Sequence, residues 1–80
     1  MTILNEKIRL AKVILSTLER EPLRYTPLLK KCMNACGSPH KFNYLLQWLR
    51  EQGYIEAVLI KEKRHWKATD KGLRFLQGLI

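Results

Sequence analysis

Two segments of the sequence carry side chains of the types that bind phosphates and the edges of nucleic-acid bases. The first spans residues 38–53, where cationic, amide and aromatic side chains alternate with apolar ones. Lysine binds phosphates and guanine, whereas the amides of asparagine and glutamine suit adenine. The candidate contacts in this segment are Ser38, His40, Lys41, Asn43, Tyr44 and Gln47. Arg50 belongs to the same polar face. The alternative interpretation is an ordinary solvated helix face.

The second segment, residues 61–67, is strongly basic. Four of its seven residues are Lys or Arg, with one Glu among them. Such a cluster suits the phosphate backbone or the minor groove of DNA. Its candidate contacts are Lys61, Lys63, Arg64, His65 and Lys67. The alternative is a solvated charged hairpin, but a helix-turn-helix pattern directly upstream favours a nucleic-acid contact.

The first segment predicts one helix over residues 38–52 with both ends marked in the sequence. Ser38 can accept a hydrogen bond from an unpaired N–H of the first turn, and Pro39 suits the first helical position. Gly53 can adopt the left-handed conformation that ends many helices. The apolar residues that should pack on the core, at the spacing of one helix face, are Phe42, Leu45, Leu46 and Leu49.

Two further helices are predicted upstream. The first covers residues 3–20 and ends before Pro22, because the residue before a proline avoids the α region. The second begins with Thr26 as the cap and Pro27 in the first turn, and runs to residue 35 or 36. Gly37 then separates it from the next helix. Two helices joined by so tight a turn are typical of a helix-turn-helix.

Downstream, the periodicity changes to that of strands. Residues 54–60 are rich in β-formers, residues 61–64 suit a hairpin tip, and residues 65–68 can form the return strand. Thr69 should cap a last helix that ends at about Leu79. The order helix, helix, helix, hairpin, helix predicts one domain over residues 1–80. Its class is α+β, mostly α with a β-hairpin, of the winged helix-turn-helix type.

Three longer segments, which lie between residues 26 and 77, carry a wider pattern: TPLLKK, SPHKFNYLLQWLREQGYIE and WKATDKGLRFLQ. This pattern resembles a small family of archaeal winged helix-turn-helix DNA-binding domains. The matching positions are Tyr44, Leu45, Leu46, Leu49, Gly53, Ile55, Thr69, Gly72, Phe75 and Leu76. The resemblance implies the winged-helix fold and DNA binding, although winged helices also serve as protein-binding modules.

The charge balance indicates a polyanionic partner. Fifteen Lys and Arg against seven Asp and Glu give a formal net charge of +8. Nucleic acid is the first expectation and an anionic membrane surface the second. A membrane span needs about 18 consecutive apolar residues, and the sequence has no such run. Charges interrupt the apolar N-terminal stretch, unlike in a signal peptide. We therefore expect a cytoplasmic, nucleoid-associated protein with no membrane partner.

Two cysteines, Cys32 and Cys36, precede His40 with the spacing C-x3-C-x3-H. One helix face would hold both thiols, and core packing is the main interpretation. A metal or redox site is the alternative, although two thiols and one imidazole leave a structural zinc site one ligand short. We expect buried, reduced thiols with neither metal nor cofactor. The sequence lacks a serine elbow, a glycine-rich phosphate loop and paired carboxylates, so we do not expect an enzyme.

Apolar residues beyond the main stripe of the first helix suggest a second subunit. Ile3, Leu10 and Val13 lie off that stripe, and the chain ends with Leu79–Ile80. Because small domains rarely leave such patches in water, we predict a homodimer through the first and last helices. The alternative is a first helix that is buried on two sides of its own fold. Separately, Trp66 is expected in the core below the hairpin, and Trp48 half exposed.

These observations together predict double-stranded DNA binding by a transcriptional regulator or a nucleoid-associated protein. Residues 38–52 would enter the major groove, and the wing, residues 61–67, would contact the backbone or the minor groove. Two alternatives remain. One is a winged-helix module that binds a protein within a larger complex, and the other is RNA binding.

Overall fold

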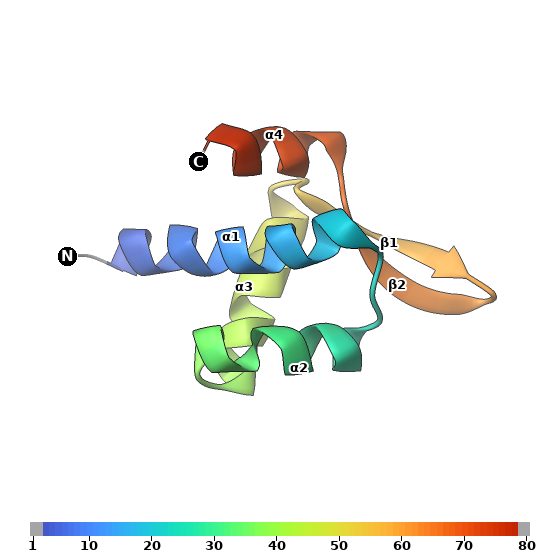
Figure 1. Cartoon of the computed structure of the whole chain (residues 1–80), viewed down its shortest axis with the longest axis horizontal. Helices are drawn as coiled ribbons and strands as arrows, with labels where there is room; N and C mark the ends of the chain where they lie inside the picture. Colours follow the sequence, from blue (N-terminus) through green and yellow to red (C-terminus); the bar gives the residue numbers. More distant parts are fainter. Residues whose placement is uncertain (1–2, 79–80) are drawn as a thin grey trace.

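The protein folds into a winged helix-turn-helix, which confirms the predicted fold class and the predicted order of elements. The computed structural model describes the backbone of residues 3–78 and the side chains of residues 6–78. Its elements are α1 (Ile3–Arg20), α2 (Tyr25–Cys36), α3 (Pro39–Glu51), β1 (Ile55–Ile60), β2 (Lys63–Ala68) and α4 (Asp70–Gly78). Figure 1 shows α1 between α2 and α4, α3 crossing behind α1, and the β1–β2 hairpin projecting beyond the helices.

Helix α1 is the centre of the core. The Ile14 side chain of this helix is fully buried. The helix contacts α2, α3, α4 and β2. The prediction that Leu10 lies off the core stripe is wrong, because Leu10 is only 2% exposed. The reason is that elements of its own fold cover α1 on more than one side. Val13 is partly buried against the same core, whereas the Ile3 side chain and residues 79–80 lie outside the described part.

The turn between α2 and α3 follows the sequence signals closely. Gly37 has a φ of +85° and donates its N–H to the Met33 carbonyl oxygen at 2.7 Å, which ends α2. The Ser38 hydroxyl accepts a hydrogen bond from the Lys41 N–H at 3.2 Å, and Pro39 begins α3. Both predicted end signals are therefore confirmed, and only Gly37 and Ser38 separate α2 from α3.

The predicted start of α2 is wrong by two residues. The helix begins at Tyr25, its N-cap is Arg24, and no side chain caps it. Thr26 lies inside the first turn. The extended segment that precedes α2 explains the shift, because Leu23 pairs with Trp66 of β2 through two backbone hydrogen bonds of 3.0 and 2.7 Å. The extended pairing ends at Leu23, so Arg24 becomes the N-cap and the helix begins at the next residue.

The wing is a tight antiparallel hairpin. Its strands run from Ile55↔Ala68 to Ile60↔Lys63, so the connecting loop contains only Lys61 and Glu62. Both loop residues have positive φ, at 53° and 68°, the conformation of a two-residue turn that matches the strand twist. The expected four-residue tip is therefore too long, and β2 begins two residues earlier than predicted.

Helix α4 is tied to the end of α3 through Thr69. The Thr69 hydroxyl donates to the Gly53 carbonyl oxygen at 2.6 Å and accepts from the Gly72 N–H at 3.0 Å, so it caps α4 as predicted. Gly53 has a φ of +80°, which also confirms its predicted role after α3. Gly72 is buried against the backbone of Tyr54. Together these contacts hold the base of the β1–β2 hairpin against the end of α3 and the start of α4.

Candidate nucleic-acid interface

The outer face of α3 has two edges that border different parts of the molecule. Successive side chains of an α-helix turn by about 100°, so Lys41 and Asn43 point roughly 160° apart. The inner face packs in the core through Phe42, Leu45, Leu46 and Leu49, as predicted. His40 is exposed between the two edges. The six candidates of this segment therefore do not form one set of contacts.

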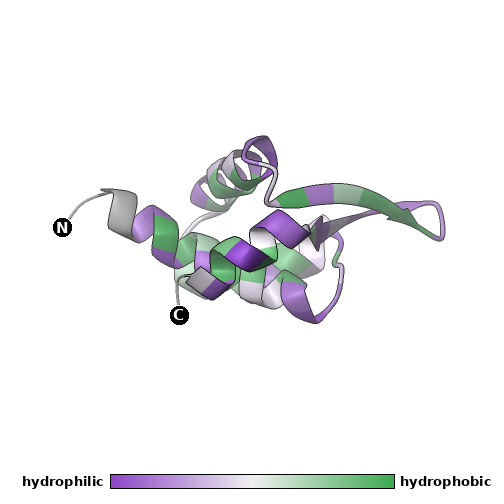
Figure 2. Ribbon diagram, turned by 90° about the horizontal axis from the view of Figure 1, so that it is seen from above, coloured by the Kyte–Doolittle hydropathy of each residue, from purple (hydrophilic) through white to green (hydrophobic). Residues whose placement is uncertain are grey.

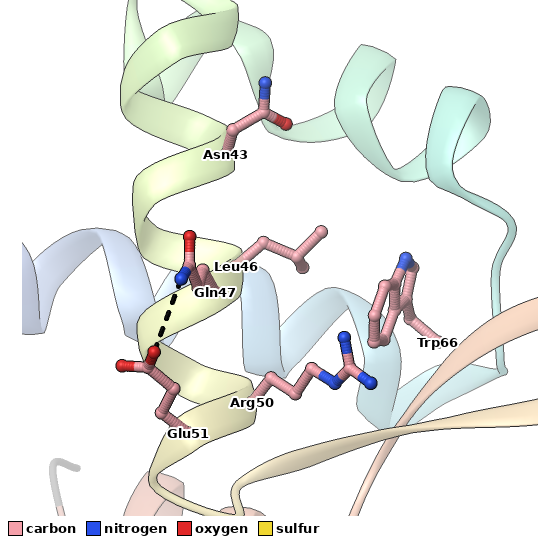
Figure 3. Close-up of a pocket in the computed structure, with 6 residues that line it drawn as sticks. All are labelled: Asn43, Leu46, Gln47, Arg50, Glu51 and Trp66. Atoms are coloured by element: carbon pink, nitrogen blue, oxygen red, sulfur yellow. Dashed lines mark hydrogen bonds between the residues drawn. The ribbon is translucent and has the colours of Figure 1, made fainter.

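One edge of α3 faces the wing across a groove. The groove has a volume of about 460 Å³ and is lined by Asn43, Leu46, Gln47, Arg50, Glu51 and Trp66. Figure 3 shows Arg50 extending from α3 toward the Trp66 indole of β2, with Leu46 between the two elements. The Gln47 amide donates a hydrogen bond to Glu51 Oε2 at 3.3 Å. The groove thus has amide groups on one wall and an aromatic ring on the other.

Arg50 belongs to the polar face that the sequence predicts for this helix, although it is not among the six candidate contacts named for that segment. Its guanidinium carbon lies 5.7 Å from the centre of the Trp66 ring, within range of a cation–π contact. Within the described residues Arg50 forms no ion pair, and its side chain is exposed. The signal was present in the sequence, because Arg50 follows Gln47 by three positions and Asn43 by seven, on the same helix edge.

Asn43 is held in place by Tyr25 at the start of α2. The Tyr25 hydroxyl donates to Asn43 Oδ1 at 2.5 Å, and the Tyr25 ring packs edge-on against Phe42 at 5.6 Å between centroids. The amide oxygen keeps a second lone pair and the amide nitrogen keeps both protons. Asn43 is therefore oriented in advance and can still bond to a base edge.

A second groove extends this surface from α2 to the wing. Its volume is about 550 Å³, and it is lined by Arg24, Tyr25, Thr26, Pro27, Lys63, Arg64 and Trp66. Trp66 lines both grooves, so they adjoin at its ring. Three cations thus lie along one of them, and Arg50 lies along the other. Arg24 was also missed, because its proximity to the wing depends on the pairing of Leu23 with Trp66.

The other edge of α3 borders α1. Lys41 Nζ lies 3.5 Å from Glu6 Oε1, an exposed ion pair, and Lys7 Nζ lies 5.1 Å from the centre of the Tyr44 ring. Lys7 also lies 4.6 Å from the Trp48 ring, which is half-buried as predicted. Lys41 and Tyr44 therefore lie on the far side of the helix from Asn43 and the wing.

The basic residues of the wing are likewise divided between two faces. The register pairs Ala57 with Trp66 and Leu59 with Arg64, and these two pairs share the face that continues the core. His65 and Lys67 alternate to the opposite face. The His65 Nδ1 lies 2.9 Å from the Lys63 carbonyl oxygen. Of the five predicted wing contacts, Arg64 and Lys63 line the groove, and Lys61 occupies the turn.

The cysteines lie away from this surface. Cys32 and Cys36 are buried, as predicted, and the Cys32 thiol approaches the Thr17 hydroxyl at 4.0 Å. Burial raises the pKa of both thiols above the ordinary value of 9.0. His40 is exposed, and in the described part of the chain no three His, Cys, Asp or Glu side chains lie close enough to share a metal ion.

The ion pair between Lys41 and Glu6 is the only one that the described residues form. No acidic side chain of the described residues therefore forms an ion pair with the cations along the two grooves, Arg24, Arg50, Lys63 and Arg64. Among residues 3–78, none of the helices combines the length and the apolar character that a bilayer crossing requires.

Comparison with known proteins gives a likeness of fold. A solved structure titled "Crystal structure of putative transcriptional regulator TA0346 from Thermoplasma acidophilum" superposes with a TM-score of 0.72. The two sequences are 21% identical, and the match covers 98% of this chain and 81% of that chain. No family model matches the sequence, and neither does any curated protein. The similarity therefore supports the winged-helix architecture and leaves the function to be argued from the site.

Proposed function

We propose that this protein binds double-stranded DNA through α3 and the wing. The observation that carries the proposal is the pair of adjoining grooves between α2, α3 and the hairpin. Cations without ion-pair partners in the described residues line these grooves, beside exposed amide side chains. A net charge of +8 supports a polyanionic partner. The fold shared with a protein titled as a transcriptional regulator favours regulation or nucleoid architecture as the role.

In this proposal the side chains divide into base contacts and phosphate contacts. Asn43 and Gln47 lie on the wing-facing part of α3 and suit adenine, so they would read bases in the major groove. Arg50 and Arg64 would bind phosphates, because arginine forms paired hydrogen bonds with phosphate oxygens. Ser38 and His40, at the N-terminus of α3, would approach a phosphate at the helix end.

The remaining predicted contacts would lie farther from the centre of the interface. Lys41 and Tyr44 are on the α1 edge of α3, where an ion pair and a cation–π contact hold them. Lys61, His65 and Lys67 would reach a flanking phosphate from the turn and the outer face of the wing. We expect these five residues to contribute less to affinity than Arg50 and Arg64.

A homodimer remains part of the proposal. Leu10 no longer supports it, but Trp48, Tyr54 and Phe75 form a half-buried ring cluster between α3 and α4. A second copy could cover these rings, and a two-fold dimer that binds two half-sites presents its recognition helices about 34 Å apart, one turn of DNA. Sedimentation at micromolar concentration should then show a species of twice the 9.5 kDa mass, and a monomer alone would contradict this part.

The decisive experiment is a salt titration with four probes: duplex DNA, duplex RNA, single-stranded DNA and single-stranded RNA. About three to five phosphate contacts per subunit should make log K for duplex DNA fall with log salt by about 0.9 per contact. A preference for duplex RNA would favour the RNA alternative. Affinity for duplex DNA that is absent, or that does not change with salt, would overturn the proposal and favour a protein partner.

Variants then separate base reading from phosphate binding. Asn43→Ala or Gln47→Ala should lower affinity for a preferred sequence by about 1–3 kcal/mol and leave a random duplex nearly unaffected. Arg50→Ala or Arg64→Ala should weaken both duplexes alike and reduce the salt slope by about one unit. If the amide variants weaken both duplexes equally, the protein is architectural and α3 does not read sequence.

Arg74→Ala provides the matched control for the loss of one charge. Arg74 is exposed on α4, which Figure 1 shows on the opposite side of α1 from α2. This variant changes the net charge by the same amount as Arg50→Ala but lies outside both grooves. It should therefore leave the number of phosphate contacts unchanged. An equal loss of affinity in both variants would mean that only net charge matters.

A further inference from the structure

Leu59 is an unusually exposed apolar side chain on the wing. It is 76% exposed, whereas the other large apolar or aromatic side chains that are exposed in the described residues reach 37–57%. Figure 2 shows β1 in hydrophobic colours with one hydrophilic band near its start, and the outer part of the strand is hydrophobic up to the hydrophilic tip. Leu59 belongs neither to the core nor to the partly buried apolar residues packed against it, so the packing of the core does not require an apolar residue at this position.

The position of Leu59 relates it to the two grooves. Leu59 is paired with Arg64, and the next pair on the same face is Ala57 with Trp66. Trp66 and Arg64 both line the groove that faces the start of α2. Because a strand rises by about 3.4 Å per residue, Leu59 lies roughly 7 Å farther out than the Ala57↔Trp66 pair, on the same face. It therefore extends the groove surface outward.

We propose that Leu59 inserts into the DNA minor groove as an apolar contact, an inference that rests on the proposed function. The minor groove has walls of deoxyribose and a floor of base edges. Proteins that enter it use arginine and lysine, and they frequently insert an apolar side chain, leucine among them. Here Arg64 lies opposite Leu59 and Lys61 follows two residues later, so both can reach the phosphates on either side. The guanine amino group, which projects into the minor groove, opposes such a contact.

Two other partners fit the wing less well. The tip carries Lys61, Lys63 and Arg64 against one acidic residue, Glu62, so two copies would repel each other there. A bilayer would need apolar side chains on one face. Ile60, the other exposed apolar residue of the tip, lies on the face opposite to Leu59, as the alternation of the strand requires.

The test compares Leu59→Ala with Ile60→Ala on two duplexes of the same sequence. In one duplex inosine replaces every guanine, which removes the amino group from the minor groove and leaves the major-groove acceptors in place. The unmodified protein should prefer the inosine duplex. Leu59→Ala should lose about tenfold in affinity for that duplex, since truncation removes apolar contact area, and should lose most of the preference. Ile60→Ala should behave as the unmodified protein does.

The salt dependence provides a second readout. Leu59→Ala removes no charge, so the slope of log K against log salt should stay the same although the affinity falls. Thermal unfolding should show that the variant keeps its fold, because the side chain is exposed. A Leu59→Ala protein with unchanged affinity and unchanged preference for inosine would overturn the inference while leaving DNA binding intact.

A last experiment measures binding of the unmodified protein and of Leu59→Ala to vesicles of phosphatidylglycerol. Binding to these vesicles that requires Leu59, together with duplex affinity that does not, would overturn the minor-groove assignment in favour of a membrane contact. If the unmodified protein binds no duplex at all, the proposed function itself fails, and the two failures are therefore distinguishable.

Discussion

Replacing Gly72 with alanine should destabilise the protein, although alanine favours helices. A Cβ atom at Gly72 would lie 2.1 Å from the Tyr54 carbonyl oxygen and 2.9 Å from the carbonyl carbon. Ordinary contact would require the two backbones to separate by about 1 Å. The close approach of α4 to the segment before β1 therefore depends on the absence of a side chain at residue 72.

The backbone on both sides of this contact is fixed by hydrogen bonds. The Tyr54 N–H donates to the Leu49 carbonyl oxygen at 2.9 Å, and the Tyr54 carbonyl oxygen accepts from the Thr69 N–H at 3.0 Å. The Gly72 N–H donates to the Thr69 hydroxyl at 3.0 Å. A shift of 1 Å would thus break at least one of these bonds in addition to straining the packing.

The expected cost follows from three terms. Overpacking costs about 1–3 kcal/mol and a lost hydrogen bond about 1 kcal/mol, whereas alanine in a helix returns about 1 kcal/mol. Gly72→Ala should therefore lower the free energy of unfolding by about 2 kcal/mol, a fall in Tm of roughly 8–16 °C for a domain of this size.

Thermal and urea unfolding measure this change, and Gly78→Ala is the control. Gly78 also lies in α4, but no atom lies within 4 Å of a Cβ built there. That variant should be neutral or slightly stabilised, by up to about 1 kcal/mol. If Gly72→Ala had the same free energy of unfolding as Gly78→Ala, the close approach of Gly72 to the Tyr54 backbone would not contribute to stability, and the reasoning would be refuted.

Two further predictions concern the wing turn and the buried thiols. Lys61 and Glu62 occupy left-handed conformations that asparagine and glycine adopt more easily. The double substitution Lys61→Asn/Glu62→Gly should therefore raise the free energy of unfolding, measured by urea titration, by about 1 kcal/mol. A lower free energy of unfolding would contradict the turn assignment. Burial raises the pKa of Cys32 and Cys36 above 9.0, so the folded state binds more protons than the unfolded state in alkali. The free energy of unfolding should keep its full value at neutral pH and should decrease as the pH rises above about 9. The double variant Cys32→Ala/Cys36→Ala should show a smaller decrease over the same pH range. An equal fall in the double variant would assign the pH dependence to other groups.

The fold was predictable where local chemistry determines it. Ser38 with Pro39, Gly37, Gly53 and Thr69 all act at the helix ends for which their side chains or backbone freedom suit them. Such end signals act within a few residues, and a single sequence contains all the information they need. The apolar stripe of α3 is equally local, since one helix face must be buried.

The errors arose where the result depends on contacts distant in the sequence. The start of α2 is set by pairing of Leu23 with a strand 43 positions later, and Leu10 is buried because the fold covers α1 on several sides. The candidate site shows the same limit. Residue types and helix spacing identified Asn43, Gln47 and the polar face that carries Arg50, but only the placement of the wing shows which edge of α3 lines the groove.

Trp66 links the stability of the fold to the geometry of the candidate interface. Its backbone pairs with Leu23 and its side chain is 8% exposed, so it belongs to the core. The same ring lines both grooves and lies under the Arg50 guanidinium. Because a core residue is held by its packing, the wing cannot swing freely relative to α3. The spacing between Asn43 on α3 and Arg64 on the wing is therefore set before any partner binds. A preformed spacing reduces the ordering cost of association, which suits a small domain with a limited contact area.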